Sequence, residues 1–278
     1  MHPNLKGFPS CHVVNLIDSP DRKVYMENEF AKLGITDYKI HSFPRIEKSD
    51  LVIKGDPEVL KVLPIGATSS HLLTIKWWYE NTDEEMAAFF EDDCEFSQVD
   101  KWNFVFEDYI KMHGVLWDGL QLCVMHEGWA VMYPRYRVGW DHGLQCYILK
   151  RSYAKKIIDY YFEDDKTINF RMPYVPLQNF NKRNESHKLQ TSIENTIYGL
   201  GWVHVHPLFN HNVIKFPSTV HDLNDKELAK IAIHSYEYVK EWWQKKGQHG
   251  TLDELFDYEW CCPSSTGQHF GSVLRFRQ

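Results

Sequence analysis

The stretch Met86-Ala87-Ala88-Phe89-Phe90-Glu91-Asp92-Asp93 decides the fold of this chain. Its apolar, uncharged first part predicts a buried strand. Three consecutive carboxylates follow, and because they repel one another and are costly to desolvate, something must offset their charge. A divalent cation is the simplest candidate, since hard oxygen ligands suit Mg²⁺ or Mn²⁺, and ligands of open α/β sheets bind at the carboxyl ends of strands. The alternative is a solvated acidic turn.

Strand and helix patterns alternate on both sides of this stretch. His12-Val13-Val14-Asn15-Leu16 predicts a strand, and Ser19-Pro20 predicts the start of a helix that Gly34 ends. Residues 66–71 lead into apolar residues at helical spacing, so a helix is expected to begin near Ser70 and His71. Further strands are predicted near 119–125, 145–150 and 202–206, and further helices near 101–112, 152–162, 190–200 and 225–246. Segments 47–64 and 163–188 are predicted to be loops.

This alternation predicts a fold class. The expectation is an α/β fold whose mixed, mostly parallel sheet carries helices on both faces, with a C-terminal helical extension. No apolar run approaches the ~20 residues of a membrane span. The net charge of −7 argues against a general nucleic-acid binder and against an anionic membrane surface as the main partner.

Four markers in roughly residues 11–160 resemble glycosyltransferase family 25, which includes bacterial lipopolysaccharide galactosyltransferases and the collagen galactosyltransferases. The markers are Asn15-Leu16 with Pro20-Asp21-Arg22; Gly66 with Ser70-His71 and Trp77; Glu91-Asp92-Asp93; and Gly143 with Tyr147-Ile148-Leu149, Arg151, Ala154, Lys155 and Lys156. The resemblance implies a GT-A-like fold and a metal-dependent, inverting transfer of a hexose. The implied donor is UDP-galactose or UDP-glucose, and the implied acceptor is a hydroxyl of a glycan, a lipid-linked sugar or a protein.

The resemblance also implies how the chain is divided. Residues 1–278 are expected to form a single GT-A-like domain. Residues 1–160 are its donor-binding half, residues 161–222 supply the acceptor loop, the base and a late metal ligand, and residues 223–278 are a C-terminal helix and tail. The donor sugar within the hexoses, the acceptor, the linkage and the oligomeric state are not set by the sequence.

The resemblance assigns donor and metal roles to the first three markers. Asp93 is expected to bind Mn²⁺ or Mg²⁺, and Glu91 to contact the metal, its water or the donor ribose, with Asp92 as the third candidate. Alternation along an extended chain places Glu91 and Asp93 on one side and Asp92 on the other unless the strand has already turned. The other expected donor contacts are Asn15 and Leu16 with the base and ribose, Arg22 with a phosphate, and Ser70 and His71 at a helix N-terminus with a phosphate or its ribose. For Arg22 the resemblance equally allows a role on the helix surface.

A late histidine cluster, His204-Val205-His206 with His211 in the following loop, offers one more metal ligand. The resemblance favours His211, which arrives from a loop after the last core strand, with His206 second. The alternative is that His204 and His206 are ordinary half-buried strand residues. The 15 histidines of the chain make some clustering expected by chance.

An inverting transferase also needs a general base for the acceptor hydroxyl. Glu194, in Thr191-Ser192-Ile193-Glu194-Asn195, is expected near a helix N-terminus, where the helix dipole favours a carboxylate. Its alternative role is that of a capping-box acid for Thr191 or another first-turn acid. Asp141 is the other base candidate, although the loop 139–143 that carries it can instead line the donor-sugar or acceptor cleft.

Two rival functions remain open. One is a metal-dependent hydrolase or oxygenase centred on His204, His206 and His211, and the other is a non-catalytic carbohydrate-binding protein of the same fold.

The start Met1-His2-Pro3-Asn4 lacks the features of a secretory signal, and most of the six cysteines stand alone in apolar settings. They are expected to be reduced, in a protein located in the cytoplasm.

Overall fold

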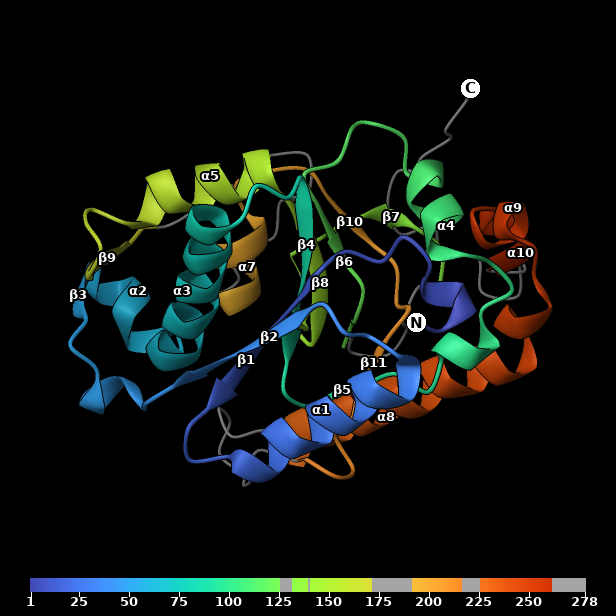
Figure 1. Ribbon diagram of the computed structural model, residues 1–278, viewed down its shortest axis with the longest axis horizontal. Coiled ribbons are helices and arrows are strands. Elements are labelled where there is room, and N and C mark those ends of the chain that lie inside the picture. Colours follow the sequence, from blue (N-terminus) through green and yellow to red (C-terminus); the bar gives the residue numbers. More distant parts are fainter. Residues whose placement is uncertain (126–131, 140, 172–191, 217–225, 262–278) are drawn as a thin grey trace.

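A mixed sheet of seven strands organises the computed structural model, which describes residues 1–125, 132–139, 141–171, 192–216 and 226–261 (Figure 1). The strand order is β2-β1-β4-β8-β6-β10-β7. The strands are β1 (Cys11–Leu16), β2 (Tyr38–Phe43), β4 (Met86–Glu91), β6 (Gly119–Gln121), β7 (Arg135–Tyr136), β8 (Cys146–Lys150) and β10 (Val203–Val205).

Most of these strands run in one direction. β2, β1 and β4 are mutually parallel, β8 is antiparallel to both β4 and β6, and β10 is parallel to β6. Strand β7 closes the sheet in the antiparallel sense beside β10. Five strands therefore end at the same edge of the sheet, and we call this edge the carboxyl edge.

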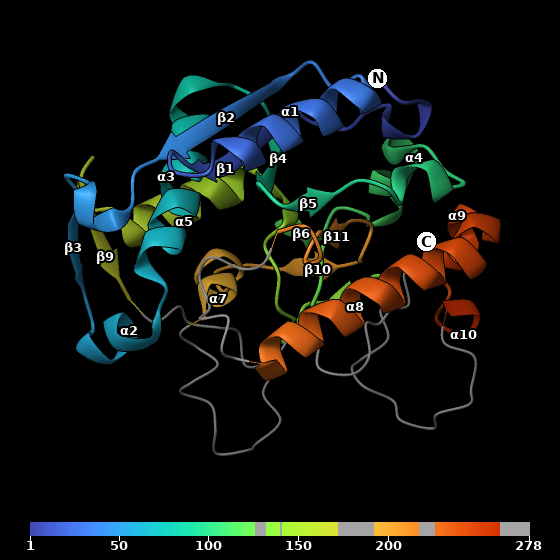
Figure 2. The ribbon, with the colours of Figure 1, turned by 90° about the horizontal axis from the view of Figure 1, so that it is seen from below.

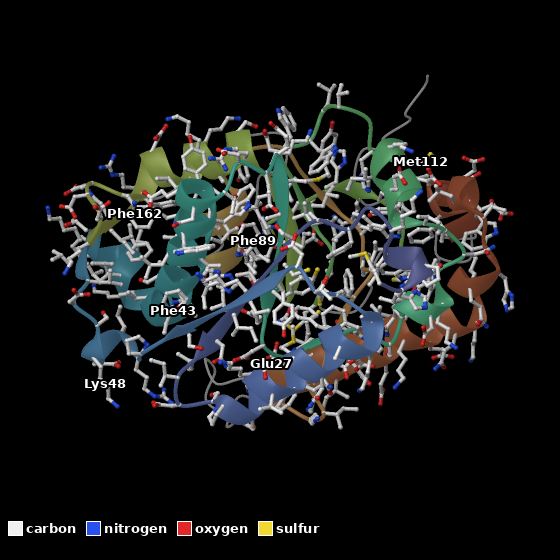
Figure 3. All side chains as sticks on the ribbon, viewed as in Figure 1. Glu27, Phe43, Lys48, Phe89, Met112 and Phe162 are labelled. Atoms are coloured by element: carbon white, nitrogen blue, oxygen red, sulfur yellow. The ribbon has the colours of Figure 1, made fainter. Side chains whose placement is uncertain are left out.

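Strand β4 lies inside because both of its faces are apolar. Ala87 and Phe89 pack into one hydrophobic core, whereas Ala88 and Phe90 pack into the other. Phe89 is stacked on Tyr147 with ring centroids 5.2 Å apart, and Figure 3 labels it near the centre of the molecule. The apolar stretch of the sequence is thus an interior strand of the sheet.

Helices cover both faces of the sheet, as predicted (Figures 1 and 2). On the face of Phe89 lie α3 (Ile65–Asn81), α5 (Arg151–Tyr161) and α7 (Ile193–Tyr198). On the face of Phe90 lie α1 (Pro20–Leu33), α4 (Phe106–Met112) and the long α8 (Lys226–Lys245). The α/β class, the mixed and mostly parallel sheet and the two helical layers are confirmed.

Helix α1 has the ends that its sequence predicts. Pro20 occupies its first turn and Gly34 ends it in the left-handed conformation, with φ of 64°. Ser19 stands at the N-cap position but makes no side-chain cap hydrogen bond.

Helix α3 begins earlier than predicted. Pro64 is its N-cap residue, so Ser70 and His71 lie in its second turn and not at its start. The hydroxyl of Ser70 donates to the carbonyl of Gly66 at 3.0 Å, as a residue inside a helix does. The predicted phosphate site at a helix N-terminus formed by Ser70 and His71 is therefore wrong.

Two segments predicted as loops contain secondary structure that pairs. Strand β3 (Val52–Gly55) and helix α2 (Pro57–Val62) lie in segment 47–64, and strand β9 (Thr167–Phe170) lies in segment 163–188. β3 and β9 form a parallel two-stranded sheet. The remainder of the predicted acceptor loop, residues 172–191, lies outside the described residues, as do 217–225 and the tail from 262.

A second small sheet is important for the site. Strand β5 (Cys94–Glu95), directly after the acids, pairs with β11 (Asn210–His211) in the antiparallel sense. α9 (Leu252–Leu255) and α10 (Tyr258–Cys261) follow α8. Within the residues described, no helix is long and apolar enough to cross a membrane.

Candidate functional site

Two carboxylates meet one guanidinium at the carboxyl edge, directly after β4. Arg22 Nη1 lies 3.0 Å from Asp92 Oδ1 and 3.0 Å from Asp93 Oδ2. Asn15, near the end of β1, donates its side-chain amide to Asp92 Oδ2 at 2.7 Å. All four side chains are buried. We call Asn15, Arg22, Asp92, Asp93 and His211 the acid cluster.

His211 reaches this cluster through the small sheet. Its backbone pairs with Cys94 in the β5–β11 ladder, and its Nε2 lies 3.3 Å from Asp93 Oδ2. The backbone N–H of Asn212 donates to the carbonyl of Asp93 at 2.9 Å, which holds the two segments together. The fold thus places the favoured late histidine beside the last acid of the motif.

Glu91 points to a different set of partners. Its Oε1 lies 3.3 Å from His71 Nε2, and its Oε2 accepts a hydrogen bond from Gln145 Nε2 at 2.6 Å. Because β4 ends at Glu91, Asp92 and Asp93 belong to a turn in which both face Arg22. The grouping of Glu91 with Asp93 that strand alternation predicts is therefore wrong, and the structure realises the early turn instead.

The two aspartates differ in their protonation. Burial, together with the charge of Asp93, raises the pKa of Asp92 to about 6, although Asn15 and Arg22 oppose the shift. Burial also raises the pKa of Asp93, but His211 and Arg22 outweigh it, and the net shift is downward. Conversely, the charge of Asp93 raises the pKa of His211 against the effect of burial. The fold therefore favours the charged form of Asp93.

A divalent cation fits this cluster only if a bound ligand supplies some of the atoms that coordinate it. Among the described residues, no group of three or more His, Cys, Asp and Glu side chains is arranged to hold a metal. However, Asp93 Oδ1 is buried without a hydrogen-bond partner in that part of the chain, and the same holds for Nδ1 of His211. Mg²⁺-type sites commonly combine one or two carboxylates with substrate phosphates and water. The Asp93 carboxylate fits such a site, and a ring nitrogen of neutral His211 is the second available ligand.

His206 lies in an aromatic environment away from these contacts. Its Nδ1 is 3.2 Å from the hydroxyl of Tyr109, and its ring packs against Tyr109, Trp243 and Phe256. Burial lowers its pKa to about 3. His204 pairs with His113, with 3.0 Å between the two Nδ1 atoms. These contacts match the alternative interpretation in that both side chains are packed, although both are fully buried instead of half-buried and His206 lies just after β10.

The remaining predicted donor residues have structural partners. His71 Nδ1 lies 2.9 Å from the hydroxyl of Tyr147, so its ring bridges α3, β8 and Glu91. Leu16 is the last residue of β1 and is partly buried. Arg22 lies between the two aspartates and acts as their counter-ion.

Glu194, the predicted base, lies farther along the carboxyl edge, at the start of α7. Its Oε1 accepts a hydrogen bond from the backbone N–H of Gly143 at 3.0 Å and lies 3.7 Å from His142 Nδ1. Ser192 is the N-cap residue and accepts from the N–H of Asn195, so Glu194 is not the acid of a capping box here. Thr191 lies outside the described residues. Burial raises the pKa of Glu194, but the opposite effects of His142 and of the Gly143 N–H are together larger, and the pKa is lowered to about 2.

Asp141, the second base candidate, is fully buried and fully engaged. Arg135 binds both of its carboxylate oxygens, and the N–H of Val138 donates to Oδ2 at 2.7 Å. This arrangement stabilises the turn that precedes His142. We therefore do not propose Asp141 as the base. Gln145 and His142 were not predicted from the sequence, although both neighbour the Gly143 marker.

No profile of a known protein family matches the chain, and no curated protein matches it by sequence. Among solved structures, the chain is similar to A197 from STIV at 11% identity and a TM-score of 0.35, over 72% of this chain and 83% of that one. It is also similar to HddC from Yersinia pseudotuberculosis at 10% identity and a TM-score of 0.26, over 58% of this chain and 69% of that one. The similarity to HddC from Yersinia pseudotuberculosis complexed with GMP-PN has 12% identity and a TM-score of 0.27, over 81% of this chain and 99% of that one. Likenesses this weak carry no argument about fold or function.

Proposed function

We propose that this chain is a metal-dependent glycosyltransferase of GT-A-like fold, related to family 25, that transfers a hexose from a UDP donor to a hydroxyl acceptor. The observation that carries the proposal is the acid cluster. Three segments far apart in sequence meet at Asp93: the end of β4, helix α1 through Arg22, and β11 through His211. They meet at the carboxyl edge, where open α/β sheets bind ligands.

The cluster suits a diphosphate leaving group. Asp93 and His211 would hold Mn²⁺ or Mg²⁺, and the ion, when bound, offsets the negative charge that develops on the diphosphate. Arg22 fixes both aspartates in place, so that the Asp93 carboxylate is held before the donor arrives. Asn15, hydrogen-bonded to Asp92 near the end of β1, would contact the nucleotide.

The rival based on a histidine cluster has less support. His204, His206 and His211 have three different sets of partners, namely His113, Tyr109 and Asp93. A hydrolase or oxygenase of that type requires these side chains to share one ion. The non-catalytic carbohydrate-binding protein differs from the transferase only in turnover, so it is an outcome of the test below.

The test is the affinity for UDP with and without Mn²⁺, measured by titration calorimetry. Asp93→Asn and His211→Ala are each expected to weaken Mn²⁺-dependent UDP binding at least about tenfold, the scale of losing a metal ligand or its close partner. Because the fold favours the charged form of Asp93, Asp93→Asn should also lose some stability, and so His211→Ala provides the second, independent variant. Asp159→Asn, at an exposed acid of α5, is the matched control.

Three results are informative. Loss of binding in both cluster variants, with donor turnover in the wild type, supports the transferase. Binding of sugar without nucleotide supports a carbohydrate-binding protein. Wild-type UDP affinity in both Asp93→Asn and His211→Ala at saturating Mn²⁺ would rule out the acid cluster as the donor site.

A further inference from the structure

A short segment connects Glu194 to the acid motif. The backbone N–H of Gly143 donates to Glu194, and the side chain of Gln145 donates to Glu91. Since β8 is antiparallel to β4, the residues that precede β8 lie beyond the carboxyl end of β4. Three residues span at most about 11 Å, which bounds the distance between the Cα atoms of His142 and Gln145. His142 therefore lies at the carboxyl edge, close to the acid motif.

The turn that carries His142 is held by buried groups. Gln121 Nε2 lies 3.1 Å from the carbonyl of His142 and 3.0 Å from that of Gly143. Arg137 Nη2 donates to the carbonyl of Asp141 at 3.1 Å. Gly143 has φ of 117°, and a Cβ there would lie 2.9 Å from a backbone oxygen. The backbone at His142 is therefore fixed in one position.

The side chain of His142 differs from its surroundings in remaining accessible. It is 37% exposed, whereas that of Glu194 is 10% exposed and Asp141 is fully buried. Glu194 Oε1 faces the Nδ1 atom of His142. A carboxylate at Nδ1 orients an imidazole and leaves Nε2 to exchange a proton with a ligand.

We propose that His142, oriented by Glu194, is the general base that removes the proton from the acceptor hydroxyl. This inference rests on the proposed transferase function. The acceptor oxygen forms a bond to the anomeric carbon, the bond from that carbon to the diphosphate breaks, and the diphosphate leaves with the electron pair. The acceptor proton moves to Nε2 of His142. Glu194 is a positioning residue in this step, and it does not take the proton.

The charges around His142 support this division of roles. A base is effective when its pKa lies near the working pH, and the pKa of Glu194 is about 2. The pKa of His142 is raised, chiefly by Glu194 and further by Asp141, while burial and Arg137 oppose the shift. His142 acts in its neutral form, so turnover should increase as the pH rises through this pKa.

The experiment uses hydrolysis of UDP-galactose and UDP-glucose, with water as the acceptor hydroxyl, and UDP affinity as a separate measurement. His142→Gln should lower kcat by roughly 10²–10⁴-fold, the usual size of general-base catalysis, and leave UDP affinity within about twofold. Glu194→Gln keeps an acceptor for the Gly143 N–H but removes the charge. It should therefore shift the acid limb of the kcat profile to lower pH. His234→Gln, at an exposed histidine of α8, should match the wild type.

The outcomes separate this inference from the function on which it rests. If the wild type binds UDP and hydrolyses the donor and His142→Gln does so equally well, His142 is not the base, although the transferase proposal stands. If Glu194→Gln lowers kcat by roughly 10²–10⁴-fold at every pH, without shifting the acid limb, while His142→Gln keeps wild-type kcat, Glu194 is the base. If the wild type neither binds UDP nor hydrolyses a donor, the transferase proposal fails, and the role of His142 fails with it.

Discussion

Arg22 is the residue on which the acid cluster depends. It is buried on helix α1 and is the cation between Asp92 and Asp93, with side-chain exposure of 9%. A buried charge left without its partner is expensive, whereas an exposed ion pair contributes little. The same chain contains an exposed pair, Arg45 with Asp18, in which both side chains are about half exposed.

Arg22→Gln should therefore destabilise the metal-free protein by about 3–5 kcal/mol, the cost of breaking a buried pair. Mn²⁺ should restore more stability to this variant than it adds to the wild type, because the cation then offsets the two aspartates. The measurement is urea unfolding with and without Mn²⁺. Arg45→Gln is the control and should change stability by less than about 1 kcal/mol. Equal losses in the two variants would contradict a special role for Arg22.

At the scale of elements, the turn before β8 positions His142 and receives helix α7. Arg137 Nη1 donates to Asn195 Oδ1 at 2.7 Å, and Gly143 donates to Glu194, so two residues of α7 dock onto this turn. Helix α7 has only six residues, too few for stability of its own. Its position is therefore determined by these contacts and by the packing of Ile197.

Gly143→Ala tests this turn. A Cβ would meet the carbonyl oxygen of Cys123, and the positive φ is unfavourable for alanine, so we expect a loss of about 1–3 kcal/mol and lower donor turnover. Gly114→Ala shares the positive φ but has open space, and Gly139→Ala has open space without a positive φ. Thermal unfolding should therefore show the largest loss of stability for Gly143→Ala, a smaller loss for Gly114→Ala and the smallest for Gly139→Ala. A Gly143→Ala variant as stable and active as Gly139→Ala would show that the turn tolerates displacement.

At the scale of the whole molecule, the cores contain several neutral histidines. His12 pairs with His41 at 3.0 Å, His113 pairs with His204 at 3.0 Å, and His206 contacts Tyr109. Burial lowers the pKa of all five, to about 4 for His12 and His204 and about 3 for His41 and His206. Each pair requires one ring nitrogen to donate and the other to accept, which two neutral tautomers can do.

The pH dependence of stability follows from these groups. In the unfolded chain these imidazoles bind protons below about pH 6.5. In the folded protein they stay neutral until the pH falls to about 3–4. Stability is therefore lost as the pH falls from 6.5, by up to about 1.4 kcal/mol per pH unit for each histidine. His142 and His211, whose pKa values are raised, contribute stability that is lost only as the pH rises above 6.5.

Urea unfolding at pH 7.5, 6.5 and 5.5 should accordingly reveal a steep loss of stability on the acid side. His206→Phe places an apolar ring among aromatic rings and removes one of these neutral histidines. The free energy of unfolding should then fall less steeply between pH 6.5 and 5.5, by the contribution of one histidine, which is up to about 1.4 kcal/mol per pH unit. A slope that does not change in this variant, or a wild type equally stable at pH 5.5 and 7.5, would refute the assignment of these histidines as neutral.

The sequence by itself determined the features that depend on neighbours along the chain. The apolar run before Glu91 became an interior strand because both faces of β4 are covered, and Pro20 and Gly34 set the ends of α1 through their own backbone preferences. The alternation of strands and helices predicted the layered α/β architecture. Each of these features is encoded within a few residues, where local sterics and burial decide the outcome.

Only the tertiary structure decided which side chains meet. Asp92 and Asp93 share Arg22 because the chain turns directly after β4, and His211 arrives through pairing between β5 and β11, more than a hundred residues apart in sequence. The approach of Glu194 to His142 likewise depends on how α7 docks onto a distant turn. Such contacts follow from strand register and from packing between segments far apart along the chain, which no local periodicity encodes.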